Sequence, residues 1–169
     1  MRCCLAVKYI GKHLQAETYG IEIDLHRGSR AKEILRFDVS GNRLGKVEPK
    51  DVPTGTRIIP KSFRVDGSGS IYLLDIYGRR VVVLDKTGVF IRQTAFPQEF
   101  GFFSDLAVDS KGRIFILDSV RSQVLSAAPE EDTFTMLSEN LKDLLSYPTH
   151  LEVDTKGLIY VVDEVKAGK

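Results

Sequence analysis

The sequence of 169 residues has no tryptophan and only two cysteines and two methionines. The cysteines, Cys3 and Cys4, are adjacent, and disulfide geometry fits poorly across one peptide bond. We therefore expect free thiols near one end of the chain, with a bridge to another chain or a lipid anchor as the alternatives. There is no CxxC pair, so the sequence indicates neither a zinc knuckle, a redox pair nor a c-type haem.

Long apolar runs and an excess of one charge are also missing. No stretch approaches the roughly 18 apolar residues of a transmembrane helix. The apolar start, residues 1–7, is too short for a secretory signal, so we expect a cytoplasmic protein without a membrane span. Lysine and arginine number 24 against 23 acidic residues, and this balance favours neither nucleic acid nor an anionic membrane as partner.

Familiar catalytic motifs are absent as well. The sequence contains no Walker A loop, dinucleotide-binding fingerprint, Gly-x-Ser-x-Gly elbow or His-Glu-x-x-His helix. Residues 67–70 are rich in glycine and serine, but they lie between two strand-like runs and not before a helix. The sequence therefore contains no candidate catalytic residue.

What the sequence does contain is a repeat. Three segments that read apolar-x-Val-Asp-x-x-Gly align without gaps, and their aspartates, Asp66, Asp109 and Asp154, are 43 and 45 residues apart. An apolar run ending in aspartate follows each segment. This period matches a four-stranded propeller blade.

The Asp-x-x-Gly segments predict hairpin turns. In such a segment the aspartate accepts backbone N–H groups a few residues on, and the glycine takes the positive φ that closes the turn. Further copies occur 19 residues after the first and one blade earlier. The five pairs are Asp38 with Gly41, Asp66 with Gly69, Asp85 with Gly88, Asp109 with Gly112, and Asp154 with Gly157. A calcium or magnesium site on these aspartates is the alternative. Counting back 19 residues from the first pair predicts another turn at 17–20.

The runs between the turns are apolar on both faces, as in residues 71–74 and 81–84. A half-exposed strand would alternate, so these strands must be covered on two sides, as stacked blades are. We therefore predict an all-β fold, a single domain over 1–169 made of propeller blades of four antiparallel strands. The expected ranges are about 11–48, 60–95 and 103–137, and a half blade at 149–165. Residues 138–146 carry either a helical turn or a loop.

The pattern of proline, apolar-x-Val-Asp, x-x-Gly, x-Ile-Tyr-x-x-Asp and a following Arg-x-apolar strand resembles the NHL repeat. The clearest copies are 60–84 and 148–163. The resemblance implies an incomplete six-bladed β-propeller, because six blades of about 45 residues need roughly 270. We expect either a fragment or truncated product, or a ring completed by further blades or by self-association. Exposed terminal blades would otherwise favour association.

The resemblance implies that the first strand of each blade lines the central channel. The residue just before the apolar residue that begins each repeat should therefore lie at the rim of this channel. The four residues at this channel rim are His13, Ser62, Asp105 and His150. We interpret them as polar channel lining and expect no cofactor. A divalent metal site is the alternative, since histidine and carboxylate are common zinc ligands and related families bind metal around the channel. Its candidate ligands are His13, Asp105 and His150.

Arginines recur in the loops between second and third strands, where Arg79, Arg80 and Arg121 would form a basic loop face. RNA-binding faces usually add aromatic stacking partners, and only Tyr77 is available here, so we do not expect nucleic acid. Asp75 is expected to pair with Arg80. The equivalent Asp118 faces Gln123, where a hydrogen bond is the most that can form.

Three function hypotheses remain, because NHL-like propellers serve several roles and fold alone does not choose among them. The leading one is a non-catalytic binding or scaffold module that holds a protein partner with loops at the channel mouth. The second is a piece of a metal-dependent lyase or lactonase. The third is an RNA-binding surface.

Overall fold

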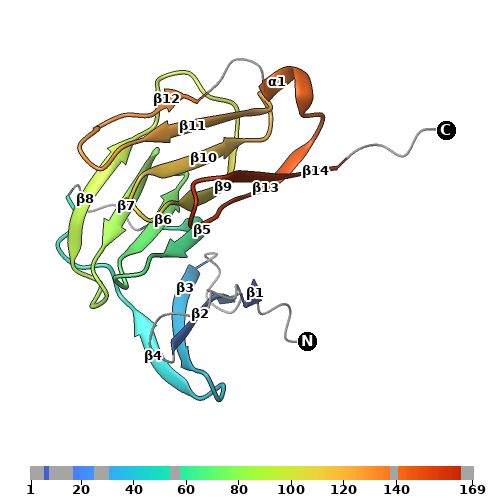
Figure 1. Cartoon of the computed structure of the whole chain (residues 1–169). Coiled ribbons are helices and arrows are strands. Elements are labelled where there is room, and N and C mark those ends of the chain that lie inside the picture. Colours follow the sequence, from blue (N-terminus) through green and yellow to red (C-terminus); the bar gives the residue numbers. More distant parts are fainter. Residues whose placement is uncertain (1–5, 8–16, 25–30, 54–57, 138–140, 165–169) are drawn as a thin grey trace.

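The computed structural model describes residues 6–7, 17–24, 31–53, 58–137 and 141–164. Three four-stranded antiparallel sheets and one two-stranded sheet follow one another along the chain (Figure 1). The first sheet contains β1 (Ala6–Val7), β2 (Glu17–Asp24), β3 (Ala31–Asp38) and β4 (Arg43–Val47). The second contains β5 (Pro60–Val65), β6 (Ile71–Asp75), β7 (Arg80–Leu84) and β8 (Phe90–Ala95).

The third sheet contains β9 (Phe103–Val108), β10 (Ile114–Asp118), β11 (Gln123–Ala127) and β12 (Thr135–Met136). A single helical turn, α1 (Leu141–Leu144), then precedes the two-stranded sheet of β13 (Pro148–Val153) and β14 (Ile159–Asp163). In every sheet the strands pair in chain order, so each sheet is an up-and-down meander. We call the four sheets blades 1 to 3 and the half-blade. The prediction of an all-β fold made of four-stranded antiparallel blades is confirmed.

The blades pack face to face, and a hydrophobic core fills each space between them. Blades 1 and 2 share a core that joins Ile34 and Val47 to Leu73. Blades 2 and 3 share the largest core, in which Leu74 lies in the same cluster as Leu106. Blade 3 and the half-blade share a third core, which includes Phe115 and Leu151.

This stacking explains why the middle strands lack an alternating pattern. Every residue of β6, β7 and β10 is buried, because one side chain in two points into the core on each side of the blade. A strand that faced water on one side would need polar residues at every second position. The two-sided burial expected from residues 71–74 and 81–84 is therefore observed.

The five Asp-x-x-Gly segments form tight turns with one geometry. In each, aspartate Oδ1 accepts the backbone N–H groups two and four residues on, at 2.8–3.0 Å. The glycine N–H donates to the aspartate carbonyl at 3.0–3.1 Å, and the glycine φ lies between 78° and 92°. A residue with a Cβ rarely adopts that φ, so the aspartate and the glycine are needed together.

Blade 1 differs from its prediction. Residues 17–20 are not a turn: they open β2, in which Glu17 pairs with Asp38 and Gly20 with Leu35. The 19-residue spacing fails here because β2 and β3 form a ladder of eight residues each, longer than the five-residue pairs of the later blades. The strand expected near residues 5–10, ahead of a blade starting near residue 11, is present as β1 and pairs with β2 as part of the same sheet.

The second turn of blade 3 lacks the usual glycine and closes differently. The Glu131 carboxylate accepts the N–H of Ala128 at 2.7 Å, while the Glu131 N–H donates to the Ala128 carbonyl at 3.0 Å.

No helix in the described part of the chain is long and apolar enough to cross a membrane.

Candidate functional site

The two ends of the blades differ in what they carry. One end has the Asp-x-x-Gly turns. The other has the turns between second and third strands and the connections that lead to the next blade (Figure 1). We call this second end the loop face and define it by residues 76–79, 96–102, 119–122 and 145–147.

A buried aspartate fixes the loops of blade 3 on this face. Asp118 is fully buried and ends β10. Its Oδ1 accepts the N–H groups of Phe102, Val120 and Arg121 at 2.9–3.1 Å, and its Oδ2 accepts that of Gly101 at 2.6 Å. A Cβ on Gly101 would lie 2.5 Å from Oδ1, so the close approach requires glycine. Gln123 faces Asp118 in the ladder of β10 and β11, as predicted, while the carboxylate accepts these backbone N–H groups.

The equivalent aspartates act in related ways. Asp163 accepts the N–H groups of Ser146 and Tyr147, at 2.9 and 2.6 Å, and so holds the chain that leads into β13. Asp75 accepts the N–H of Gly78 at 3.1 Å and pairs with Nε of Arg80 at 3.2 Å. The predicted ion pair between Asp75 and Arg80 is thus present, and both residues are buried.

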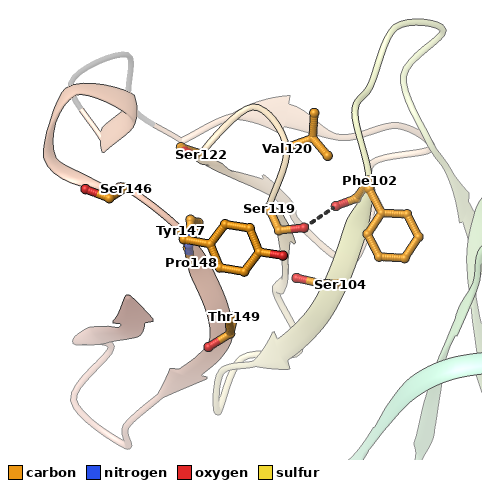
Figure 2. Close-up of a pocket in the computed structure, with 9 residues that line it drawn as sticks. All are labelled: Phe102, Ser104, Ser119, Val120, Ser122, Ser146, Tyr147, Pro148 and Thr149. Carbon is orange, nitrogen blue, oxygen red and sulfur yellow. Dashed lines mark hydrogen bonds between the residues drawn. The ribbon is translucent and has the colours of Figure 1, made fainter. Parts of the chain in front are cut away.

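The loops held by Asp118 and Asp163 form the walls of a pocket of about 410 Å³ between blade 3 and the half-blade. Figure 2 shows the wall from blade 3, with Phe102 and Val120, facing the wall from the half-blade, with Tyr147 and Thr149. The volume lies within the range of about 300–1,000 Å³ that is usual for ligand sites.

Six of the nine residues that line the pocket carry a hydroxyl group, and none of the nine is charged. The hydroxyl-bearing residues are Ser104, Ser119, Ser122, Ser146, Tyr147 and Thr149. Some of these hydroxyls are already paired within the protein. Ser119 Oγ donates to the Phe102 carbonyl at 3.2 Å, and Thr149 Oγ1 donates to the Val162 carbonyl at 3.3 Å.

Ser104 is different, because its Oγ is buried and has no hydrogen-bond partner in the structure. A buried polar atom without a partner costs about 1–3 kcal/mol of stability. Ser104 lies near the start of β9, and Figure 2 shows its hydroxyl directed toward the side on which Tyr147 and Thr149 lie. Nothing in the repeat pattern marked this serine.

Apolar side chains surround the pocket opening and continue across the loop face. Phe102 is 40% exposed, Tyr147 60%, Val120 70% and, on the neighbouring blade, Tyr77 78%. Exposed apolar groups gathered on one face are typical of protein-binding surfaces, whereas single ones need no explanation. Of these four residues, the sequence pattern had pointed only to Tyr77.

Two of the predicted channel-rim residues, Ser62 and Asp105, belong to a hydrogen-bond network that joins three strands. The Ser62 hydroxyl donates to Asp105 Oδ1 at 2.6 Å, and Asp105 Oδ2 accepts the N–H of Leu151 and the guanidinium of Arg64, both at 3.1 Å. Arg64 also donates to the Leu151 carbonyl at 2.9 Å. This network joins the first strands of blade 2, blade 3 and the half-blade. Arg64, which the sequence pattern did not single out, contacts all three strands.

The remaining rim residues do not join this network. His150 is exposed, and its Nδ1 lies 3.1 Å from Thr149 Oγ1. His13 lies outside the described residues, as do Cys3 and Cys4. Within the described ranges, no three histidine, cysteine or acidic side chains gather in a way that could hold a metal ion.

The predicted basic loop face contains fewer exposed arginines than expected. Arg80 does not belong to it, because this residue is only 5% exposed and donates to Asp75, Gln93 and the Pro53 carbonyl. Arg79 is exposed but lies over the Phe100 ring, 4.9 Å from its centre. Arg121 Nη2 lies 3.8 Å from a Glu99 carboxylate oxygen.

Stacked four-stranded meanders whose first strands β5, β9 and β13 adjoin one another are the blades of a β-propeller. The fold is similar to virginiamycin B lyase from Staphylococcus aureus, with a TM-score of 0.61 and 15% identity over 95% of this chain and 48% of that chain. A gluconolactonase from Xanthomonas campestris gives 0.56 and 15% over 86% and 52%. YCF48 bound to D1 peptide gives 0.51 and 12% over 86% and 43%.

These similarities define the fold, because the sequence identities are low. The chain spans about half the length of the structures it matches. Comparisons with known protein families and with curated proteins found no match.

Proposed function

We propose that the chain is a non-catalytic binding module whose loop face holds a segment of a protein partner. The observation that carries this proposal is the pocket between blade 3 and the half-blade, which is uncharged, rich in hydroxyls and bordered by the exposed side chains of Phe102, Val120 and Tyr147. Interfaces combine exposed aromatic and apolar anchors with polar groups that fix orientation. One structure with this fold, YCF48, is bound to a peptide.

The chemistry of the other candidate sites supports the choice. A metal site on His13, Asp105 and His150 would need the Asp105 carboxylate, which already binds Arg64, Ser62 and a backbone N–H. A metal ion bound to Asp105 would have to break the buried ion pair between Asp105 and Arg64. The alternative function as a lyase or lactonase therefore rests on the fold alone.

RNA binding is disfavoured for a related reason. Arg80 is buried in its pair with Asp75, and Arg121 has an acidic neighbour in Glu99. Arg79 and Arg121 remain exposed, but each already has an intramolecular contact. Two such residues provide little positive charge for binding the phosphates of a nucleic acid.

We further propose that the chain supplies about three and a half blades of a ring of the NHL type, which either further blades complete to six or self-association closes. The outer face of the half-blade supports this, since Leu158, Tyr160 and Val162 are each more than half exposed. Light scattering of the purified chain tests completion by a second copy. A mass that rises with concentration is expected, and a monomer at all concentrations would exclude that mode.

The binding proposal is tested by selecting peptides from a random phage-displayed library on the purified full chain. Val120 on the loop face and Val39 in the turn of residues 38–41 offer a matched pair, because both are valines in turns, 70% and 76% exposed. Selected peptides should lose at least tenfold in affinity on Val120→Asp and bind Val39→Asp as they bind the original chain. Failure to enrich any peptide, or equal loss with both variants, would contradict the proposal.

Metal analysis with and without chelator addresses the alternative. A stoichiometric divalent ion that is lost in His150→Ala would replace the binding proposal with a metal-dependent function.

A further inference from the structure

We infer that the pocket between blade 3 and the half-blade is the specificity pocket of the peptide site, and that it accepts an uncharged residue able to hydrogen-bond to Ser104. This inference rests on the proposed function and adds the chemistry of the bound segment. Asparagine, glutamine, serine and threonine side chains have the required groups.

The lining determines the charge of the occupant. None of the pocket residues is charged, and Asp118, the carboxylate that holds the blade 3 wall, is fully buried and engaged by four backbone N–H groups. A charged side chain in the pocket would lose water without gaining a partner of opposite charge. An uncharged polar group loses less and can be compensated by the wall hydroxyls.

Ser104 determines the position of the hydrogen bond. Among the hydroxyls of the pocket, it is the one that is both buried and without a partner in the structure. A ligand group that reaches this oxygen supplies a hydrogen bond that no protein group provides in the structure. The neighbouring Tyr147, which lines the same pocket, is 60% exposed.

The walls are preorganised for such a ligand. Asp118 fixes the loops at 101–102 and 119–121 from one side, and Asp163 fixes residues 146 and 147 from the other. Because these loops are held by hydrogen bonds in the free protein, binding orders few additional groups, which favours affinity. The pocket is thus set by the same aspartates that recur at the end of each second strand.

The experiment uses peptides selected on the full chain and compares Ser104→Ala with Ser110→Ala, an exposed serine in the Asp-x-x-Gly turn at the opposite end of blade 3. Ser104→Ala should weaken peptide binding about tenfold, while the melting temperature stays the same or rises, because the variant removes an unpartnered buried hydroxyl. Ser110→Ala should change neither. A merely structural role for Ser104 would lower the melting temperature and leave the affinity of the folded protein unchanged.

A second measurement varies the peptide and does not depend on the folding of any variant. Each position of a selected peptide is replaced in turn by asparagine, aspartate and lysine. At one position, aspartate and lysine should each weaken binding at least tenfold, asparagine should be tolerated, and this preference should vanish on Ser104→Ala. Peptides that bind the original chain with no such position, or that bind Ser104→Ala equally well, would overturn the inference and leave the proposed function standing. If no peptide is enriched at all, the proposed function itself fails.

Discussion

The second strands of blade 2 and of the half-blade have almost the same sequence but different surroundings. β6 reads Ile-Tyr-Leu-Leu-Asp and β14 reads Ile-Tyr-Val-Val-Asp. All of β6 is buried, whereas β14 alternates between half-buried and exposed residues. Tyr72 is 5% exposed and its counterpart Tyr160 is 54% exposed. The difference arises because β6 lies between two blades and β14 has a described blade on one side.

The comparison shows that the strand sequence encodes a position in a blade, while the neighbouring blade determines burial. Both tyrosines donate to the aspartate of their own hairpin turn, Tyr72 to Asp66 at 3.0 Å and Tyr160 to Asp154 at 3.2 Å. The local structure is thus the same in the two places. Energetic effects of equivalent substitutions should therefore differ.

Core truncation should separate the two strands most strongly. Leu74→Ala removes a fully buried side chain from the core between blades 2 and 3, and we expect a loss of about 2–5 kcal/mol in the free energy of unfolding. Val162→Ala, at the equivalent position but 56% exposed, should change it by less than about 0.5 kcal/mol. Urea unfolding measures both. Equal losses would mean that the outer face of the half-blade is covered in solution.

Loss of the strand-ending aspartate should have the next largest effect. Asp118→Ala leaves four backbone N–H groups without their acceptor in a buried place, and we expect a loss of about 2–4 kcal/mol. Asp163→Ala frees two N–H groups that water can reach, with an expected loss of about 1 kcal/mol. Thermal unfolding of the two variants gives the order, and a larger effect at Asp163 would contradict our account of the loop face.

The tyrosine pair tests burial through pH. Burial, and to a lesser degree the charge of Asp66, raises the pKa of Tyr72, while the hydrogen bond to Asp154 raises the pKa of Tyr160. Since a raised pKa favours the protonated form in the folded state, the contribution of Tyr72 is complete below about pH 10 and is lost as the pH rises further. Tyr72→Phe should cost about 1 kcal/mol near neutral pH and flatten the alkaline decline. If near-ultraviolet titration found Tyr72 ionising before Tyr160, the burial difference would be wrong.

The smallest effect concerns the turn aspartates of blade 3 and the half-blade. At Asp109 burial opposes ionisation, but hydrogen bonds from the N–H groups of Arg113 and Lys111 outweigh it, and the pKa is lowered. At Asp154 the hydrogen bond from the Leu158 N–H is the main cause of a lowered pKa. A lowered pKa contributes stability that is present above about pH 4 and lost as the pH falls.

Carbon-13 NMR titration of the carboxyl groups should therefore find both aspartates ionising below their usual range. Asp109→Asn removes the carboxyl group that titrates, so it should reduce the acid dependence of stability by about 1 kcal/mol or less. Asparagine keeps one acceptor oxygen for the backbone N–H groups of the turn. A normal pKa at both residues would show that the turns do not hold their aspartates as the structure describes.

Local rules account for what the sequence could predict. The Asp-x-x-Gly turns depend on residues within four positions of one another, and two-sided burial follows from strands such as residues 71–74 that are apolar throughout. The turn expected at 17–20 failed because the strands of blade 1 are longer, which spacing alone does not reveal.

The candidate site could not be predicted in the same way, because its contacts join distant segments. Arg64 binds Asp105 and Leu151, which lie 41 and 87 residues further along the chain. Ser104 looks like any strand serine until blade 3 and the half-blade enclose it. Arg80 was expected on the exposed face because arginines recur in the loops between second and third strands, but it is the first residue of β7, opposite Asp75, and is buried in an ion pair with it.

Native-state hydrogen exchange of the purified chain, at a dilution at which light scattering gives the mass of a monomer, tests the stacked-blade account most directly. Amides of β6, β7, β10 and β11 should exchange slowest and together, since they open only when the whole stack unfolds, and β14 should exchange markedly faster. Slow exchange in β14 equal to that of β6, or fast exchange throughout β6 and β10, would contradict the claim that neighbouring blades decide which of these matching strands is protected.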